Sequence, residues 1–96
     1  MIRSFGDKLT DALFHGRSGK ETRSFPPELK KVAQRKLDMV NAAHVLEDLR
    51  VPPNNRLEAL KHERRGQHSI RINDQFRICF VWTEGGPMEV EVVDYH

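Results

Sequence analysis

Residues 67–96 read QHSIRINDQFRICFVWTEGGPMEVEVVDYH, and this stretch decides the expected fold. Its sequences Asn-Asp-Gln at 73–75 and Gly-Gly-Pro at 85–87 are typical of tight turns and divide the stretch into three segments. Within each segment apolar and polar residues alternate, as they do in β-strands that bury one face. We therefore predict an antiparallel meander of three strands at the C-terminal end of the chain.

The alternation also predicts which side chains share a face of the sheet. Arg71 and Arg77 lie on adjacent strands of one hairpin, each on the face opposite its apolar neighbours. If helices cover the apolar face, both arginine side chains project from the open face. The apolar face is expected to contain Ile70, Ile72, Phe76, Ile78, Phe80, Trp82, Met88, Val90 and Val92.

The residues before the meander show mainly helical spacing. The expected elements are an edge strand at residues 2–5, helices at 6–14, 26–43 and 45–49, a loop at 15–25 and a short strand at 57–60. The apolar stripe of the second helix consists of Leu29, Val32, Ala33, Leu37 and Val40. Its cations are expected to form a solvated face, and they are Lys30, Lys31, Arg35 and Lys36.

Helices followed by an antiparallel meander indicate an α+β fold. We expect one domain over residues 1–96, in which the N-terminal helices pack on one face of a small, mainly antiparallel sheet. The lone cysteine, Cys79, excludes an internal disulfide and is expected to be buried and inert. No apolar run is long enough to span a bilayer and no signal peptide is evident, which predicts a cytoplasmic protein without membrane contact.

The total charge says little about partners, because 16 Lys and Arg stand against 14 Asp and Glu and give a formal net charge of +2. The distribution is more informative. Residues 56–77 are enriched in cations, namely Arg56, Lys61, Arg64, Arg65, Arg71 and Arg77, against Glu58, Glu63 and Asp74. A basic segment therefore directly precedes and enters the predicted sheet.

The last three residues directly follow an apolar strand, so we expect Asp94, Tyr95 and His96 to be held at the end of the sheet. Together with Arg71 and Arg77 they would bring two guanidiniums, a carboxylate, a phenol and an imidazole close to one another. Guanidinium groups match phosphate oxygens, and histidine transfers protons near neutral pH. This set of groups suits chemistry on a phosphodiester.

Two plainer interpretations stay open. Each arginine could pair with a cross-strand acid such as Glu89 or Glu91, and His96 could belong to a frayed terminus. His62 and His68 flank the basic segment and are weaker functional candidates. No histidine pair has the spacing of a zinc site, and we expect neither a metal nor a cofactor.

At these residues the sequence resembles a known family. Residues 60–82 read LKHERRGQHSIRINDQFRICFVW. With the closing Asp94, Tyr95 and His96, they are similar to the HigB toxins of the RelE/ParE superfamily, the killer proteins of bacterial plasmid-maintenance systems. The similarity is densest over residues 57–96, and the N-terminal helices agree with the family in order and length.

The resemblance implies a RelE-like fold and a type II toxin that acts as a metal-independent endoribonuclease. Such a toxin cleaves mRNA in the A site of the 70S ribosome by attack of the RNA 2′-hydroxyl. The expected products are a 2′,3′-cyclic phosphate and a 5′-hydroxyl. The resemblance also implies neutralisation by a HigA-type antitoxin with a helix-turn-helix domain, through which alone the toxin would reach operator DNA.

The family pattern also implies roles for individual residues. Carried over by position, the active residues would be Lys61, Arg77, Asp94, Tyr95 and His96. Lys61 and Arg77 would stabilise the phosphorane, while His96 would act as general base or acid. Asp94 would orient His96, and Tyr95 would assist it or stack on a base. RNA contacts are expected from Arg64, Arg65, His68 and Arg71.

The sequence departs from the family pattern at Glu58. Several HigB proteins have a catalytic histidine three residues before the lysine, where this chain has Glu58, and His68 stands where relatives often have tryptophan. Glu58, or His62 in its place, would then supply the substitute acid or base. Two other functions stay open on the same fold, a ParE-like inhibitor of gyrase and a non-catalytic regulator that binds its antitoxin or RNA.

Overall fold

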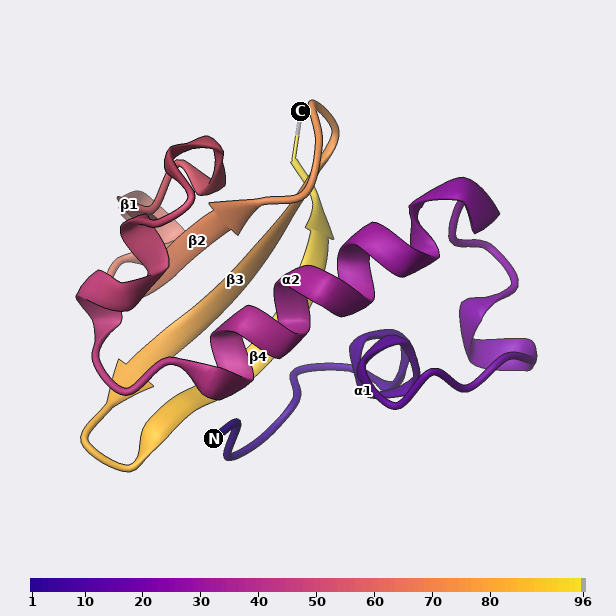
Figure 1. The fold of residues 1–96 in the computed structure, drawn as a ribbon, viewed down its shortest axis with the longest axis horizontal. Helices are drawn as coiled ribbons and strands as arrows, with labels where there is room; N and C mark the ends of the chain where they lie inside the picture. The colour runs from indigo at the N-terminus through magenta and orange to yellow at the C-terminus, as the bar shows by residue number, and fades with distance from the viewer. Residues whose placement is uncertain (96) are drawn as a thin grey trace.

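The computed structural model describes residues 1–95, in which two helices pack on a four-stranded sheet (Figure 1). The helices are α1 (Lys8–Phe14) and α2 (Lys30–Ala42), and the strands are β1 (Glu58–Ala59), β2 (His68–Arg71), β3 (Phe76–Thr83) and β4 (Gly86–Asp94). The 3-10 turns are η1 (Lys20–Thr22), η2 (Pro27–Leu29), η3 (Leu46–Arg50), η4 (Pro53–Asn55) and η5 (His62–Arg64). Each strand pairs with the next in antiparallel fashion, which confirms the predicted α+β architecture.

The register of β2 and β3 decides what each face of the sheet presents. Ile70 pairs with Ile78, and Arg71 pairs directly with Arg77. Both isoleucines are fully buried. Because successive side chains of a strand point to opposite faces, both arginines lie on the other face. The prediction that Arg71 and Arg77 share the open face is confirmed.

The core forms where α2 crosses the sheet (Figure 1). Ala33, Leu37 and Val40 on α2 are fully buried, as the apolar stripe predicted. They belong to one cluster with Ile72, which directly follows β2, and with the strand residues Ile70, Ile78, Phe80, Val90 and Val92. Truncation of a buried leucine such as Leu37 to alanine costs about 2–5 kcal/mol, so this contact is a main source of stability.

The assignment of Met88 to the apolar face is wrong, because β4 contains a bulge. Cys79 pairs with Glu91 but Val81 pairs with Met88, so β4 holds one extra residue in this interval. Glu89 lies within the bulge and has a φ of 53°, in the left-handed region. The extra residue moves Met88 to the open face, where it is 37% exposed.

One cation of α2 also departs from its prediction. Lys31 and Arg35 are exposed as expected, whereas Lys36 is only 5% exposed. Asn55 at the end of η4 lies against this side of α2, and its Oδ1 accepts a hydrogen bond from Lys36 Nζ (2.5 Å). Packing against a segment distant in sequence therefore overrides the helical pattern, which contains no information about that segment.

The N-terminal segment covers the outer edge of β4. Phe5 forms a parallel bridge with Val90, and Val90 N donates to the carbonyl oxygen of Ser4 (3.1 Å). Further along, Val92 N donates to Oγ1 of the buried Thr10 (2.8 Å). These bonds satisfy backbone groups that an uncovered edge strand would expose. The edge pairing predicted for residues 2–5 is confirmed at Phe5.

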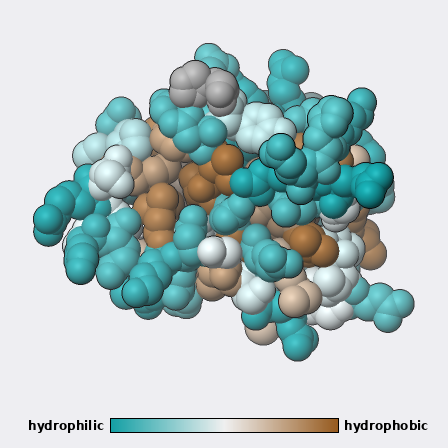
Figure 2. Space-filling view, turned by 180° about the vertical axis from the view of Figure 1, so that it is seen from behind, coloured by the Kyte–Doolittle hydropathy of each residue, from teal (hydrophilic) through white to brown (hydrophobic). Residues whose placement is uncertain are grey.

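Figure 2 shows the molecule from the side opposite to Figure 1. Hydrophilic side chains cover most of this surface, and the apolar side chains show as separate patches between them. Within residues 1–95, no helix combines the length and the apolar character needed to cross a membrane.

Candidate active site

A cavity of about 310 Å³ opens beside the turn between β2 and β3 and the C-terminal end of β4. It is lined by Arg56, Glu58, Arg71, Asn73, Asp74, Arg77 and Tyr95. Three arginines against two carboxylates make the lining cationic. The structure thus brings together Arg71, Arg77, Tyr95 and Glu58 among the residues that the sequence singled out.

Arg77 is firmly held in this cavity, with a side chain that is 12% exposed. Its Nε donates to Ser69 Oγ (2.7 Å), and its Nη2 donates to the carbonyl oxygen of Arg56 (2.7 Å). These bonds engage Nε and Nη2, and among residues 1–95 no acceptor is bonded to Nη1. A guanidinium fixed along one edge can present its other edge to a phosphate oxygen.

Arg71 lies directly across the ladder from Arg77 and pairs with Asp74 in the adjoining turn. Like charges at directly opposed positions destabilise a sheet, so the opposition of Arg71 and Arg77 lowers its stability locally. Among residues 1–95, neither arginine forms an ion pair with Glu89 or Glu91. Their acidic partners are Asp74 and Glu58 instead.

Glu58 reaches the cavity from β1. It pairs with Ser69 on β2, so its side chain shares the face that carries Arg77. Its Oε1 lies 3.5 Å from Nη2 of Arg77, and its side chain is 53% exposed. The carboxylate is therefore both oriented by Arg77 and accessible to a ligand.

The end of β4 is fixed to the β2–β3 turn. Tyr95 N donates to the carbonyl oxygen of Gln75 (2.6 Å), and Gln75 Nε2 donates to Asp94 Oδ2 (3.0 Å). The Tyr95 ring centroid lies 5.9 Å from Cζ of Arg77, within the range of a cation–π contact. The expectation that these residues are held at the end of the sheet is confirmed for Asp94 and Tyr95. His96 lies outside the described residues.

Arg64, an expected RNA contact, forms an ion pair on the open face. Its Nη1 donates to Glu91 Oε1 (2.8 Å), and this hydrogen bond raises the pKa of Arg64. Beside it, burial raises the pKa of the Cys79 thiol, in agreement with the inert buried cysteine that the sequence predicts.

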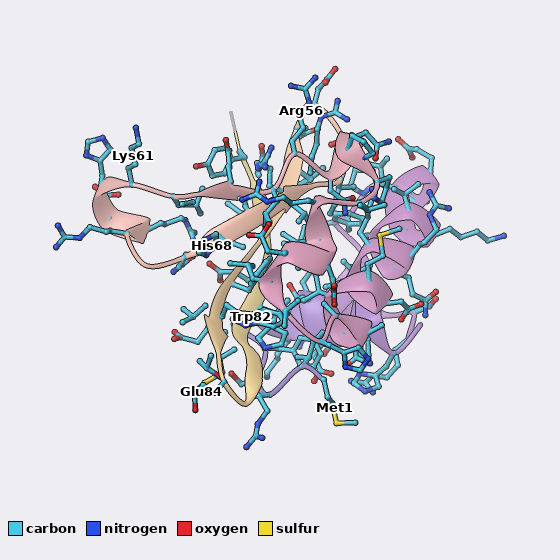
Figure 3. The ribbon with its side chains drawn as sticks, turned by 60° about the vertical axis from the view of Figure 1, so that its left-hand side comes forward. Met1, Arg56, Lys61, His68, Trp82 and Glu84 are labelled. Atoms are coloured by element: carbon cyan, nitrogen blue, oxygen red, sulfur yellow. The ribbon has the colours of Figure 1, made fainter. Side chains whose placement is uncertain are left out.

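Three further candidates do not line the cavity. Lys61, His62 and Arg65 are exposed in or beside η5, which projects from the body of the molecule, with Lys61 well apart from Arg56 (Figure 3). The remaining candidate, His68, pairs with Phe80, which places its ring on the helix-covered face. Its Nδ1 is buried and has no hydrogen-bond partner among residues 1–95.

The structure adds to the cavity three residues that were not predicted as site residues, Arg56, Asn73 and Asp74. Asn73 Oδ1 accepts the backbone N–H groups of Gln75 (2.9 Å) and Phe76 (2.8 Å), which fixes the turn. The Asn-Asp-Gln sequence that predicted this turn also indicates that Asn73 and Asp74 lie at the cavity, because the turn joins the strands that carry Arg71 and Arg77. Among residues 1–95, no group of three or more His, Cys, Asp or Glu is placed to hold a metal ion.

Residues 3–96 match the family described as the RelE-like toxin of type II toxin–antitoxin system HigB. The chain belongs to the HigB-like toxin family. Toxin HigB-1 of Vibrio cholerae is 36% identical over 85 residues, which cover 88% of this chain and 87% of that protein. An uncharacterized protein of Haemophilus influenzae is 46% identical over 55 residues, 57% of this chain and 54% of the relative.

A solved structure supports the fold of this HigB-like toxin. The YoeB-YefM complex from Staphylococcus aureus matches with a TM-score of 0.61 and 14% sequence identity, over 100% of this chain and 98% of that chain. The predicted RelE-like fold and the resemblance to HigB are confirmed. Membership of a type II toxin–antitoxin family also gives the chain an antitoxin as its partner.

Proposed function

We propose that this toxin is an endoribonuclease that cuts mRNA in the A site of the translating 70S ribosome. The observation that supports the proposal best is the direct opposition of Arg71 and Arg77 in a cavity that also contains Glu58 and Tyr95. Two guanidiniums at one point suit a phosphate that gains negative charge during reaction. The phenol ring beside them can stack on a nucleobase.

The proposed reaction is an internal displacement at phosphorus. The RNA 2′-oxygen forms a bond to phosphorus, its proton passes to a general base, and the bond from phosphorus to the 5′-oxygen breaks. A general acid protonates the departing 5′-oxygen, so the products are a 2′,3′-cyclic phosphate and a 5′-hydroxyl. RNA supplies its own nucleophile, so the protein need only align the atoms, transfer protons and stabilise the phosphorane.

The cavity residues fit these tasks. Nη1 of Arg77 and the guanidinium of Arg71 stabilise the phosphorane, and the Glu58 carboxylate accepts the 2′-hydroxyl proton. Tyr95 stacks on a base or shares proton transfer with His96, which Asp94 orients. Lys61, at the exposed position directly before η5, reaches the phosphate once RNA is bound.

The partners follow from this proposal. A HigA-type antitoxin with a helix-turn-helix domain neutralises the toxin and links it to operator DNA. The 70S ribosome presents the mRNA, so the toxin acts in the cytoplasm. Arg64, Arg65 and the other cations of residues 56–77 support RNA binding around the cavity.

Primer extension on a reporter mRNA in a reconstituted translation reaction tests the proposal. Wild-type protein is expected to produce cuts at in-frame codons only when the mRNA is translated. His96→Ala is expected to remove these cuts, and Arg77→Ala is expected to reduce them strongly. Both variants should still bind antitoxin and unfold cooperatively. Intact mRNA with undiminished translation in the wild-type reaction would overturn the proposal.

A further inference from the structure

Lys36 is an unusual residue for the inside of this protein. Lysine is rarely buried without a partner, because removing an ammonium group from water is costly. Lys36 is 5% exposed, and its Nζ donates to the neutral amide oxygen of Asn55 (2.5 Å). Within residues 1–95 it belongs to no ion pair, and burial, with Arg35 and Arg71 nearby, lowers its pKa.

Asn55, the partner of Lys36, organises the turn that leads to the cavity. It is fully buried, and its Nδ2 donates to the carbonyl oxygen of Leu49 (3.1 Å) and, at the distance limit, to that of Val51 (3.5 Å). Its backbone N donates to the carbonyl oxygen of Pro52 (2.9 Å). One asparagine side chain thus closes the loop after η3, and Lys36 binds the amide oxygen that remains.

Arg56, the residue after Asn55, connects this turn to the cavity through its backbone. Arg56 has φ 48° and ψ 55°, a left-handed conformation that is unfavourable for a residue with a side chain. Its N donates to the carbonyl oxygen of Pro53 (3.1 Å), and its own carbonyl oxygen accepts the 2.7 Å hydrogen bond from Arg77 Nη2. The position of that carbonyl therefore depends on how firmly Asn55 is held.

We propose that Lys36 and Asn55 are positioning residues for Arg77. The Lys36–Asn55 hydrogen bond fixes the left-handed turn at Arg56, and the Arg56 carbonyl fixes the guanidinium of Arg77 in the cavity. The inference rests on the proposed nuclease function for its kinetic consequence, although the path from α2 to the cavity is a property of the fold. A helix on the covered face of the sheet thereby controls a group on the open face.

A double-mutant analysis separates positioning from general stability. Lys36→Met keeps the apolar stem and removes the hydrogen-bond donor, and Asn55→Ala removes the acceptor. Each variant is expected to slow cleavage by roughly tenfold to a hundredfold at a temperature where it is fully folded. In an Arg77→Ala background the same substitutions should have little further effect, because the group they position is absent.

Val40→Ala is the matched control, since it opens a cavity in the core on the same helix and removes none of the hydrogen bonds of this path. It should lower the unfolding temperature and leave the cleavage rate of folded protein unchanged. If Lys36→Met slows cleavage equally with and without Arg77, or no more than Val40→Ala does, the positioning role is wrong.

An NMR measurement keeps the inference testable without nuclease activity. The Arg77 Nε–H resonance is expected to shift in Lys36→Met and in Asn55→Ala but not in Val40→Ala. Titration with inorganic phosphate should perturb it less in the first two variants than in wild type. If wild type does not cut mRNA, the proposed function fails while this readout still decides the positioning role, and an unchanged resonance in both variants would overturn it.

Discussion

Arg71 and Arg77 occupy directly opposed positions on β2 and β3, so the sheet itself brings two guanidiniums to one wall of the cavity. Opposed like charges are unfavourable in an isolated sheet. Asp74 and Glu58 compensate part of this repulsion from the rim, at side chains that are largely exposed. A phosphate bound between the two guanidiniums would reduce their repulsion further. The first two predictions depend on such phosphate binding.

The first prediction concerns catalysis. Arg77→Ala is expected to reduce mRNA cleavage by roughly a hundredfold to a thousandfold, as for loss of one preorganised donor to a transition state. Cleavage rates from reconstituted translation measure the loss, and circular dichroism measures the fold. Arg35→Ala is the matched control, because Arg35 is an exposed arginine on α2, away from the cavity lining. Equal rates for Arg77→Ala and Arg35→Ala would contradict a role for Arg77.

The second prediction concerns stability. Inorganic phosphate at about 100 times its Kd should raise the free energy of unfolding by about 2.7 kcal/mol, because it binds only the folded cavity. Urea unfolding at constant ionic strength measures this gain. Phosphate also stabilises proteins generally by exclusion from their surface. In the double variant Arg71→Ala/Arg77→Ala, only this general stabilisation should remain. If phosphate raises the free energy of unfolding of this variant as much as that of wild type, phosphate does not bind in the cavity.

Much of the fold was predictable because strong local patterns agreed with the tertiary structure. The period-two alternation of residues 68–83 gave the faces of β2 and β3, and it therefore placed Arg71 and Arg77 together. The helical stripe of α2 likewise identified Leu37 and Val40 as core. These patterns succeed because burial of one face is their physical cause.

The errors have equally specific causes. Met88 lies on the open face because Glu89 forms a bulge, and an alternating sequence contains no signal for one extra residue. Lys36 is buried because Asn55 provides a partner from a segment distant in sequence. Helical periodicity predicts which residues share a face of a helix, but not which distant segments pack against that face.

The site was predictable only in part for a related reason. Arg77 and Tyr95 followed from strand alternation and from the end of β4. Arg56 reaches the cavity because its backbone is left-handed at the end of η4. No local sequence pattern indicated that conformation. The carbonyl contact that fixes Arg77 is likewise a property of tertiary structure.

The third prediction is a pH dependence of stability. Asp48 Oδ2 accepts the backbone N–H groups of His44 (2.9 Å) and Val45 (3.2 Å), and these hydrogen bonds lower the pKa of Asp48. A lowered folded-state pKa contributes stability above the unfolded-state pKa and loses it as pH falls through the folded-state value. Asp48→Asn should therefore reduce stability at about pH 7, with a smaller difference from wild type at about pH 3.

Urea unfolding at the two pH values measures that difference. Asp38→Asn, at an exposed position of α2, is the control for removal of one negative charge. If the Asp48→Asn deficit stays constant across the acid range, the two backbone hydrogen bonds do not depend on ionisation of Asp48.

The fourth prediction tests Glu58 as the general base. Its Oε1 lies 3.5 Å from Arg77 Nη2 on the accessible side of the cavity, where a bound 2′-hydroxyl could reach it. Glu58→Gln keeps the size of the side chain but removes its basicity, so cleavage should fall by roughly a hundredfold to ten-thousandfold. Binding of the antitoxin should be unchanged.

Glu58→His gives the decisive comparison, because imidazole is also a general base and ionises nearer neutral pH than a carboxylic acid. This variant is expected to restore cleavage relative to Glu58→Gln and to move the acidic limb of the pH–rate profile towards neutral pH. A base at position 58 would produce that shift, whereas a residue that only orients Arg77 would not. If Glu58→Gln cleaves at the wild-type rate, the proton passes to another group, and His62→Ala becomes the next variant to measure.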